Sequence, residues 1–484
     1  MKTIVVIGGG LGGLTAAALL AQDGYKVTLL EQHTIVGGCA TTFKRKGFTC
    51  EVGLHEMDGV YTNPQIKKIF DRLDVYKHVE MLKAPEFFKV TTKNSTFVMP
   101  DGVDESKKAL IEKFPHEEVA IVKYFNILKQ ISDTFAKIGA LKWYDYLIFP
   151  LIIYPILRYK DKTVTEVFAN LFRDEELKLI LNTNVQYYND SPDTLSFLLH
   201  AVAQYSYYKG GGYFIKGGSG CLSDYLATVI RDNGGSVITK ANVTTCTAKS
   251  VTYQYKKESI VIEADKIISN LSPADTYALF DIPYQETKEI GNSLLTIYIG
   301  FSKNIKELYG VGAYSNFFYD DIESVAVFNS MLQKDITERA FVFVDYSQID
   351  ARLTKDPHKS FGAVCMLDSL DEWKGLSKEA YRAKKLELER AIVTKLESHY
   401  PELSKYIEYI ETGTAKTVES YIKTPNGTAY GYKPTPKQFL KMPQVKSKKV
   451  HNLYFVGQWV IAGGFTPSIS SGYICYEKII GDNF

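Results

Sequence analysis

Three glycines, Gly8, Gly10 and Gly13, form a G-x-G-x-x-G pattern directly after the β-branched run at residues 3–7. Such a run is typical of a strand buried on both faces of a parallel sheet. The first glycine permits a tight turn, the second lets the backbone approach a pyrophosphate, and the third allows close helix–strand packing. Free N–H groups at the start of the next helix, expected over about residues 12–22, would bind phosphate. The pattern therefore predicts a dinucleotide-binding turn.

An acidic residue, Glu31, stands at the end of the second expected strand, residues 26–30. Its carboxylate can accept hydrogen bonds from ribose hydroxyls and would repel a 2′-phosphate, which argues against NADP. Strand, glycines, helix, strand and acid in this order are far more specific than the glycine pattern alone. The residues expected to contact the dinucleotide in this segment are Gly8, Gly10, Leu11, Gly12, Gly13, Glu31 and Gln32.

The composition excludes several classes of protein. The 484 residues carry 57 Lys+Arg and 55 Asp+Glu, a formal net charge of +2, so there is no strong basic field for nucleic acid. Hydrophobic residues make up 45%, which is ordinary globular usage, and the 13% of aromatic residues fits a chain that lines a large apolar cavity. Six scattered cysteines lack metal-ligand spacing. They predict reduced, buried thiols and no metal site.

The sequence predicts no membrane-spanning segment, because no apolar stretch approaches the roughly 18–20 residues that are needed. The apolar N-terminus has Lys2 as its only positive charge and is broken by glycines, so we expect no signal peptide and a cytoplasmic location. Residues 147–157 (LIFPLIIYPIL) are apolar, with Lys142 and Trp143 before them and basic residues after them. One interpretation is an ordinary buried segment. The other is a membrane-interface segment, residues 142–162, that makes peripheral contact with lipid.

A second glycine pair, Gly37-Gly38, follows Glu31 closely and precedes Thr42. The run EQHTIVGGCATTFKRKGFTCEVGLH resembles the E-x5-GG…G-x-H run of the carotenoid isomerase and retinol saturase branch of the phytoene desaturase family. Members of that family are FAD enzymes with a fold similar to the amine oxidases. The resemblance implies FAD as the cofactor, with Gly37, Gly38 and Thr42 in contact with it.

A region in the middle of the chain resembles the same family. It comprises a glycine-dense loop at 209–220, an expected helix at 222–231, and short expected strands between 243 and 263. The order is similar to the family's loop, helix and strand whose valine backs onto the adenine. The resemblance assigns that role to Val243.

The C-terminal region completes the resemblance. The runs NLYFVGQ and AGGFTPSISSG, followed by a final helix expected from about Tyr473, are similar to the family's ending. There, the Gly-Gln pair meets the ribityl-phosphate part of the flavin, and the later loop lies against the ring. The resemblance assigns these roles to Gly457, Gln458, Thr466, Pro467 and Ile469.

The expected fold is α/β, with a Rossmann-like FAD-binding domain of the amine-oxidase type interleaved with a mixed α+β substrate domain. The FAD-binding domain is expected to be discontinuous, and the substrate domain to carry the candidate membrane-interface segment. The predicted ranges are 1–75, 209–285 and 425–484 for the FAD-binding domain, and 76–208 and 286–424 for the substrate domain.

The resemblance implies an FAD-dependent oxidoreductase that desaturates, saturates or isomerises carbon–carbon double bonds of a lipid-soluble polyene or isoprenoid. Delivery of a hydride and a proton requires an acid. His55, which matches the family's Gly-x-His, and Glu56 are the candidates. Alternatively, His55 only shapes its loop and Glu56 belongs to a solvated turn with Asp58.

Two other functions stay open on the sequence, as do the reaction direction and the electron acceptor or donor. One is an amine-oxidase-like flavoenzyme for an amine or porphyrinogen, although those enzymes usually carry Gly-Glu where this chain has Gly457-Gln458. The other is a non-catalytic prenyl-lipid-binding protein, similar to the Rab escort and GDP-dissociation-inhibitor proteins. Absence of a tightly bound yellow cofactor would favour the latter.

Overall fold

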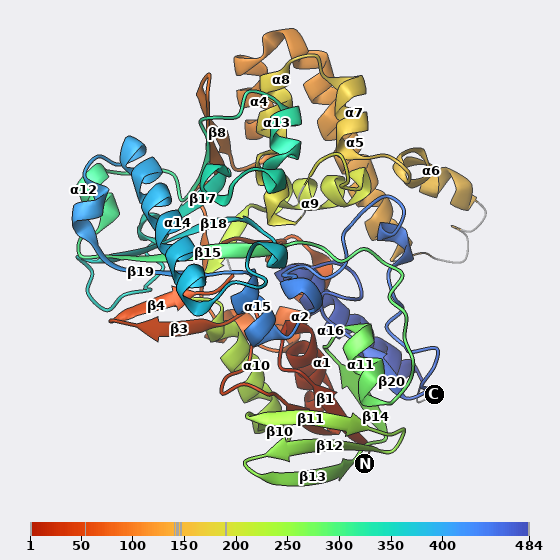
Figure 1. Cartoon of the computed structure of the whole chain (residues 1–484). Coiled ribbons are helices and arrows are strands. Elements are labelled where there is room, and N and C mark those ends of the chain that lie inside the picture. Colours follow the sequence, from red (N-terminus) through yellow and green to blue (C-terminus); the bar gives the residue numbers. More distant parts are fainter. Residues whose placement is uncertain are drawn as a thin grey trace.

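Short β-branched strands from three distant parts of the chain form one parallel sheet. The computed structural model describes residues 2–53, 55–139, 141, 145, 148–188 and 191–482. The strand order in this sheet is β10-β2-β1-β14-β20, with every neighbouring pair parallel (Figure 1). The strands are β1 (Thr3–Ile7), β2 (Lys26–Leu30), β10 (Ser236–Ile238), β14 (Lys266–Ser269) and β20 (Leu453–Phe455).

The two faces of this sheet are covered differently. Ile4 and Val6 pack into the cluster that includes helix α1, whereas Val5 and Ile7 pack into a separate cluster with strands β11 to β13. The alternation follows from the opposite directions of successive side chains in a strand. The covering helices are α1 (Leu11–Gln22), α10 (Gly220–Asp232) and α16 (Phe465–Gly481), and the strands β11 (Ala241–Cys246), β12 (Ser250–Tyr255) and β13 (Glu258–Glu263) form an antiparallel sheet.

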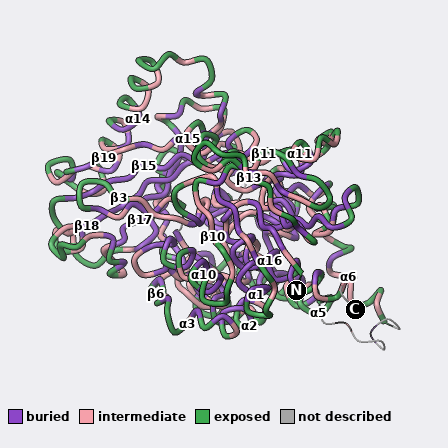
Figure 2. Tube along the Cα trace, turned by 90° about the horizontal axis from the view of Figure 1, so that it is seen from below, coloured by how far each residue is buried: buried purple, intermediate pink, exposed green. Residues whose placement is uncertain are grey.

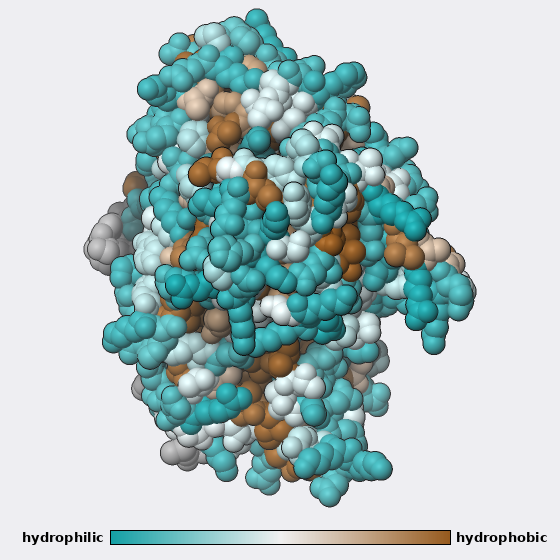
Figure 3. Space-filling model, turned by 90° about the vertical axis from the view of Figure 1, so that its left-hand side faces the viewer, coloured by the Kyte–Doolittle hydropathy of each residue, from teal (hydrophilic) through white to brown (hydrophobic). Residues whose placement is uncertain are grey.

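A second, larger sheet lies beside the first (Figure 1). Its strand order is β19-β15-β18-β17-β16-β7-β8, and only the pair β16 and β7 is parallel. Helix α14 (Lys378–His399) packs on one face through Leu388, Ile392 and Leu396. Most charged side chains of this helix are exposed or half-buried, although Glu389 is buried and its carboxylate accepts a hydrogen bond from Thr412 over 2.6 Å. The face of the molecule that carries α14 is mainly hydrophilic (Figure 3). The strands are β7 (Glu86–Thr92), β8 (Thr96–Pro100), β15 (Ser293–Phe301), β16 (Ser315–Tyr319), β17 (Phe341–Asp345), β18 (Ser360–Asp368) and β19 (Ile407–Gly413).

A helical layer lies at the far side of the larger sheet (Figure 1). Its helices are α4 (Val103–Lys113), α5 (Glu118–Ile138), α6 (Phe149–Tyr159), α7 (Val164–Leu171), α8 (Glu175–Leu181) and α9 (Phe197–Gly210). A short 3₁₀ helix, η3 (Thr183–Tyr187), follows α8. One large hydrophobic cluster runs from α1 and α16 through the small central strands to this layer.

Small elements connect these layers. A three-stranded sheet has the order β5-β9-β6, and its strand β5 contacts both α16 and α9. The remaining elements are β3 (Thr42–Arg45), β4 (Phe48–Glu51), β5 (Met57–Asp58), β6 (Met81–Lys83), β9 (Gly212–Ile215), α2 (Pro64–Arg72), α3 (Val75–His78), α11 (Pro273–Leu279), α12 (Ile305–Tyr309), α13 (Val325–Asn329) and α15 (Ala415–Ile422).

The predicted start of the last helix is wrong by eight residues, because α16 begins at Phe465 and not at about Tyr473. The intervening Ser and Gly residues favour loops intrinsically. Tertiary contact overrides that preference: a Cβ added at Gly472 would lie 2.5 Å from the main-chain oxygen of Gly12. The small residues therefore allow α16 to pack closely against α1.

The apolar segment around residue 150 is not the ordinary buried segment of the first interpretation. Helix α6 projects from the helical layer and is mainly exposed or half-buried (Figure 2). Leu151 is 75% exposed, and only Ile156 of this helix is buried. Lys142, Trp143 and Leu147 lie outside the described residues. No helix in the described part of the chain is long and apolar enough to cross a membrane.

The six cysteines are free thiols, as predicted. Their predicted burial is wrong for Cys221, which is exposed on α10, and Cys39 is only half-buried. Position 221 lies in the first turn of α10, beside the inward-facing Leu222, so its side chain points to solvent.

Candidate active site

The glycine-rich turn leaves no room for side chains. Gly8 has φ of +92°, and a Cβ added at Gly13 would lie 2.4 Å from the main-chain oxygen of Gly8. A Cβ at Gly12 would lie 2.6 Å from the main-chain nitrogen of Gly457. Gly10 precedes α1, whose first-turn N–H groups have no intrahelical partner, and Leu11 is buried behind them. The turn thus presents bare backbone donors, as phosphate binding requires.

Glu31 lies at the end of β2 and is 7% exposed. Its carboxylate accepts hydrogen bonds from the main-chain N–H groups of Gly9 (2.7 Å) and His33 (2.8 Å). Gln32, between them in sequence, is half-buried. The main-chain oxygen of Glu31 accepts a bond from Ala241, the first residue of β11, and the half-buried Val243 follows on that strand. Glu31 and Val243 therefore lie in the same region of the sheet edge.

The second glycine pair lies against the first turn. The N–H of Gly37 donates to the main-chain oxygen of Gly9 over 2.7 Å, and Gly37 forms an isolated parallel bridge with Gly10. Gly37 and Gly38 have φ of +115° and +61°, a backbone conformation that favours glycine. The two glycine motifs thus form one continuous backbone surface.

Asn270, which sequence analysis did not select, lies between this surface and the C-terminal region. Its side-chain Nδ2 would be 2.4 Å from a Cβ at Gly10, and its Oδ1 would be 2.6 Å from a Cβ at Gly457. The Oδ1 atom is buried and has no hydrogen-bond partner in the described part of the chain. A buried amide oxygen without a partner, next to bare backbone, fits the binding of a donor such as a sugar hydroxyl. Asn270 lies in the SNLSP turn, which was the available signal.

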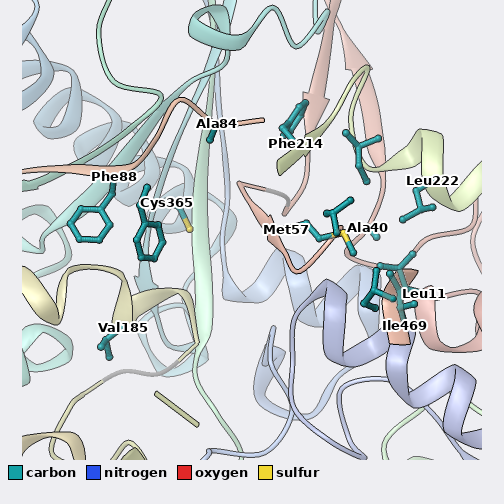
Figure 4. Close-up of a cluster of buried hydrophobic side chains, with 14 of the residues drawn as sticks. Leu11, Ala40, Met57, Ala84, Phe88, Val185, Phe214, Leu222, Cys365 and Ile469 are labelled. Carbon is teal, nitrogen blue, oxygen red and sulfur yellow. The ribbon is translucent and has the colours of Figure 1, made fainter. Parts of the chain in front are cut away.

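The C-terminal residues close the other side of the site. Gly457 has φ of +85°, and its N–H donates to the Ser471 hydroxyl over 2.7 Å. Gln458 follows and is half-buried. Figure 4 shows Leu11, in the first turn of α1, close to Ile469, in the first turns of α16.

The first turn of α16 also contacts the segment that follows His55. The Thr466 hydroxyl donates to the main-chain oxygen of Asp58 over 3.0 Å, and the half-buried Pro467 is next in the chain. The structure therefore brings Gly10, Gly37, Gly457 and Thr466 to one region.

Thr42 lies at a different point, against the second glycine-dense loop. A Cβ at Gly220 would lie 2.8 Å from its Oγ1. The same loop contacts Glu51, which is 1% exposed and accepts bonds from the N–H and hydroxyl of Ser219, each over 2.6 Å. Sequence analysis missed Glu51, because the alternation of its strand predicts an exposed side chain there.

His55 is 8% exposed and surrounded by tyrosines. Its ring stacks on Tyr187 at a centroid distance of 5.7 Å, and its Nδ1 lies 3.4 Å from the Tyr346 hydroxyl. The Tyr314 hydroxyl donates to the main-chain oxygen of His55. Burial lowers the pKa of His55 to about 4. The imidazole is therefore neutral near pH 7 and cannot donate a proton as an imidazolium.

Glu56 is the next residue in the chain after His55. Both carboxyl oxygens are buried and have no hydrogen-bond partner among the described residues. A Cβ at Gly212, on β9, would lie 2.5 Å from Glu56 Oε2. Burial raises the pKa of Glu56 well above its ordinary value, and the neighbouring Glu86 and Asp101 raise it further. Burial therefore favours the protonated form of this carboxyl group, and the burial of both its oxygens contradicts the alternative of a solvated turn.

Tyrosines connect the surroundings of His55 and Glu56. Tyr187, Tyr207 and Tyr314 are buried or half-buried, and the Glu56 carboxyl raises the pKa of each, in addition to the larger effect of burial. Sequence analysis did not select them, since nothing distinguishes them among 34 tyrosines. Together they form a largely water-excluding wall around one neutral histidine and one carboxyl group whose pKa is raised.

Comparison with known proteins identifies a domain, relatives and a fold that the chain resembles. A family model described as an NAD(P)-binding Rossmann-like domain matches residues 6–73. The protein of Danio rerio named all-trans-retinol 13,14-reductase is 26% identical over 534 residues, which cover 99% of this chain and 86% of the relative. The Oncidium hybrid cultivar protein named prolycopene isomerase 1, chloroplastic, is also 26% identical. The match covers 99% of this chain and 84% of the length of that relative. This chain is a homologue of the retinol reductases and prolycopene isomerases.

The homology confirms the predicted resemblance and the prediction of an enzyme of the oxidoreductase or isomerase type. Among solved structures, wild-type putrescine oxidase bound to putrescine has a TM-score of 0.65 at 14% identity, covering 99% of both chains. This confirms the predicted fold, a Rossmann-like dinucleotide-binding sheet within an amine-oxidase-like architecture.

Proposed function

We propose that this protein is an FAD-dependent oxidoreductase that saturates, desaturates or isomerises a carbon–carbon double bond of a lipid-soluble polyene. The observation that carries the proposal is the extent of the homology, 99% of the chain. It includes the tyrosine-lined region around His55 as well as the nucleotide-binding turn. In this proposal residues 1–75, 209–285 and 425–484 bind FAD, and residues 76–208 and 286–424 bind substrate.

The family resemblance and the geometry together support a set of residues that would hold FAD. The first turn of α1 would bind the pyrophosphate, Asn270 Oδ1 would accept a hydrogen bond from a neighbouring sugar hydroxyl, and Glu31 would bind the adenosine ribose. Val243 would back the adenine. Further along the cofactor, Gly457 and Gln458 would contact the ribityl chain, and the first turn of α16, from Thr466 to Ile469, would face the ring. These contacts suit FAD because the two glycine motifs and the C-terminal loop form one extended surface.

When bound, FAD supplies hydride exchange with a carbon of the substrate. The chain's own residues supply the rest. Burial favours the protonated form of Glu56, which would supply the proton that saturation of a double bond requires, and its buried, unpartnered carboxyl makes it the better acid of the two candidates. The neutral ring of His55 stacks on Tyr187 and forms part of the tyrosine wall. One of its nitrogens can donate a hydrogen bond and the other can accept one. The tyrosine wall orients an apolar chain and excludes water.

We propose further that α6 contacts a membrane surface, from which a lipid-soluble substrate would enter. Leu151, Tyr154 and Leu157 are 75%, 59% and 47% exposed and recur every third residue along the helix. Arg158 and Lys160 follow at its C-terminal end. Apolar side chains beside cations are typical of helices that lie in the interface of an anionic membrane. The protein would then be cytoplasmic and peripheral.

An amine-oxidase-like activity is the alternative that the fold allows. It has weaker support, because burial raises the pKa of Glu56 well above its ordinary value and so disfavours the negative charge that a cationic substrate would need there. A non-catalytic prenyl-lipid-binding protein would not need the backbone surface that Gly10, Gly37 and Gly457 form.

The first experiment is to purify the chain and record its visible absorption before and after denaturation, with mass identification of any released chromophore. We expect a flavin spectrum and about one FAD per chain. Anaerobic incubation of the oxidised and reduced protein with retinol, carotenoids and amines then gives the direction and substrate class. A colourless protein that takes up no added FAD would overturn the proposal.

Two variants test the assigned residues separately. Glu31→Gln should weaken FAD binding about tenfold or more, because it weakens charge-assisted hydrogen bonds. Glu56→Gln should keep FAD but slow saturation about 10²- to 10⁴-fold. The matched control is Glu105→Gln, on the exposed side of α4. Unchanged turnover in Glu56→Gln would remove Glu56 from the catalytic role.

A further inference from the structure

Residues 212–219, which comprise β9 and the glycine-dense loop after it, contact the segment 51–58 at two points. At the end of the segment, strand β5 pairs with β9. At its start, Glu51 accepts hydrogen bonds from Ser219. One short stretch of chain therefore holds both ends of the segment that carries the two acid–base candidates.

Glu51 makes the contact at the start of the segment with both carboxylate oxygens. Oε2 accepts a bond from the N–H of Ser219 over 2.6 Å, and Oε1 accepts from the Ser219 hydroxyl over 2.6 Å and from the N–H of Gly53 over 3.3 Å. Ser219 immediately precedes α10, so its N–H lies at the positive end of the helix dipole, where an anion is favourable. Burial of a carboxylate is unfavourable unless such bonds compensate it. The 1% exposed Glu51 is therefore fixed in place by this contact.

Two glycines let the loop approach Glu51. Gly217 and Gly218 have φ of +82° and +95°, a backbone conformation that favours glycine. A Cβ added at Gly218 would lie 2.9 Å from Glu51 Oε2, and closer still to Thr42 Cγ2. Thr42 pairs with Glu51 across the β3–β4 hairpin. Contact of the loop with this hairpin thus accounts for the two glycines.

The loop is also connected to a tyrosine that contacts His55. The N–H of Gly217 donates to the main-chain oxygen of Ala351 over 2.8 Å, and the N–H of Ala351 donates to the main-chain oxygen of Tyr346 over 3.3 Å. The Tyr346 hydroxyl lies 3.4 Å from His55 Nδ1. The loop is therefore connected both to the segment that carries His55 and to a tyrosine beside its ring.

We propose that Glu51 is a positioning residue, whose carboxylate holds the segment that carries His55 and Glu56 against the loop and so fixes both side chains relative to the tyrosine wall. Glu51 acts through the main chain of Gly53 and Ser219. The inference rests on the proposed function and deepens it, because it assigns a residue to the orientation of the acid. A misplacement of about 1 Å can slow a reaction about 10²-fold.

Glu51→Gln tests the contact with little change of shape. In wild type each carboxylate oxygen accepts one main-chain N–H, whereas a side-chain amide has a single acceptor oxygen. The variant therefore loses the bond to Gly53 or to Ser219. Amide hydrogen exchange of the FAD-loaded protein, measured on peptides that contain Gly53 and Glu56, should become at least about tenfold faster.

The second measurement is a single turnover. The probe is all-trans-retinol, mixed anaerobically with the oxidised and with the reduced FAD-loaded protein, and the change in flavin absorbance gives the rate. In Glu51→Gln the rate at saturating retinol should fall about ten- to 100-fold, because the acid is misplaced. The half-saturating concentration should change less than about twofold, since the apolar contacts that bind the polyene stay.

Asp368→Asn is the matched control. Asp368 is 0% exposed, and its two oxygens likewise accept main-chain N–H groups, from Ser369 and Ala415, over 2.8 Å each. Ala415 belongs to the hydrophobic cluster under α14, which does not include the glycine-dense loop. The control should therefore lose stability as Glu51→Gln does, but keep wild-type exchange around Glu56 and a turnover rate within about twofold of wild type.

Ser219→Ala is a milder variant that keeps the test decisive if Glu51→Gln folds poorly or loses FAD. It removes only the hydroxyl bond to Glu51 and keeps the main-chain N–H. We expect the same two changes to a smaller extent, about two- to tenfold each.

The outcomes separate this inference from the proposed function. If Glu51→Gln exchanges like wild type around Glu56, or reacts at the wild-type rate, the assignment is wrong. Equal losses in Asp368→Asn would also overturn it, because they would reflect stability alone. If wild type holds FAD but reacts with no polyene, the proposed function fails, while hydrogen exchange still decides whether Glu51 holds the segment.

Discussion

The Thr466 hydroxyl donates a hydrogen bond to the main-chain oxygen of Asp58 over 3.0 Å, although 408 positions separate them in sequence. Thr466 is in the first turn of α16, and Asp58 ends β5, just after His55 and Glu56. One side chain therefore connects the helix start proposed to face the flavin ring with the segment that carries both acid–base candidates.

Thr466→Val should break this connection while keeping the shape of the side chain. We expect the free energy of unfolding to fall by about 1 kcal/mol, the usual net value of one hydrogen bond, because the Asp58 oxygen loses a partner. Thr466→Ser keeps the hydroxyl and is the control. Urea unfolding of the two variants and wild type is the measurement. Equal stability of the valine and serine variants would show that the bond contributes nothing.

The Glu56 carboxyl should make stability depend on pH. Its pKa is raised in the folded chain, so the native state binds more protons than the unfolded state once the pH exceeds the ordinary value of 4.5. Stability from this group is therefore fully present at low pH and is lost as the pH rises, by at most about 1.4 kcal/mol per pH unit. Glu56→Gln should remove this loss. Unfolding of both proteins in urea between pH 5 and pH 8 measures it.

The expected result is that Glu56→Gln gains stability relative to wild type as the pH increases. Glu105→Gln, which replaces an exposed carboxyl, should run parallel to wild type. A constant difference between Glu56→Gln and wild type would contradict the raised pKa of Glu56.

His55 should act at the opposite end of the pH range. Its pKa is lowered from 6.5 to about 4, so between these values the unfolded state binds more protons than the native state. Stability therefore falls as the pH drops from 6.5 toward 4, by roughly 3 kcal/mol in total. His55→Gln should reduce this fall in acid urea titrations. Burial lowers the pKa of His200 to about 3, so His200 contributes separately to the loss of stability in acid. The His55→Gln variant should retain that contribution.

The nucleotide-binding part of the fold could be predicted because local sequence determines it. Gly8, Gly10 and Gly13 are required by backbone geometry, and Glu31 ends a strand whose residues favour a buried parallel sheet. In these segments the propensity, the hydrophobic pattern and the turn residues agree. The start of α16 could not be predicted, because contact of Gly472 with α1 overrides the loop preference of its serines and glycines.

The acid–base site was predicted only as two positions, and its chemistry depends on tertiary structure. Whether Glu56 is solvated or buried is decided by Gly212, from a strand about 150 residues away. Asn270 and Tyr187 were missed for the same reason. Their roles come from what surrounds them in space, and a single sequence has no record of those neighbours.

The exposed face of α6 should bind anionic vesicles. Leu151→Glu places a charge where we propose that an apolar side chain enters the membrane interface, so co-sedimentation with phosphatidylglycerol-containing vesicles should weaken at least about tenfold. The matched control is Val311→Glu, because Val311 is 86% exposed and lies far from α6 in sequence. Wild-type binding that Leu151→Glu leaves unchanged, or no binding of wild type, would rule out α6 as a membrane contact.

Two glycines of helix α16 allow a test of the close packing between α16 and α1. A Cβ added at Gly472 would lie 2.5 Å from the main-chain oxygen of Gly12 and 2.8 Å from Thr15 Cβ, whereas a Cβ at Gly481 would meet nothing within 4 Å. Gly472→Ala should therefore push α16 away from α1 and lower the free energy of unfolding by about 1–3 kcal/mol. Gly481→Ala should be neutral or stabilise the helix by up to about 1 kcal/mol. Because α1 and α16 both begin at the proposed cofactor site, FAD affinity should fall with stability in Gly472→Ala alone. Equal behaviour of the two alanine variants would mean that the α1–α16 contact does not position the site.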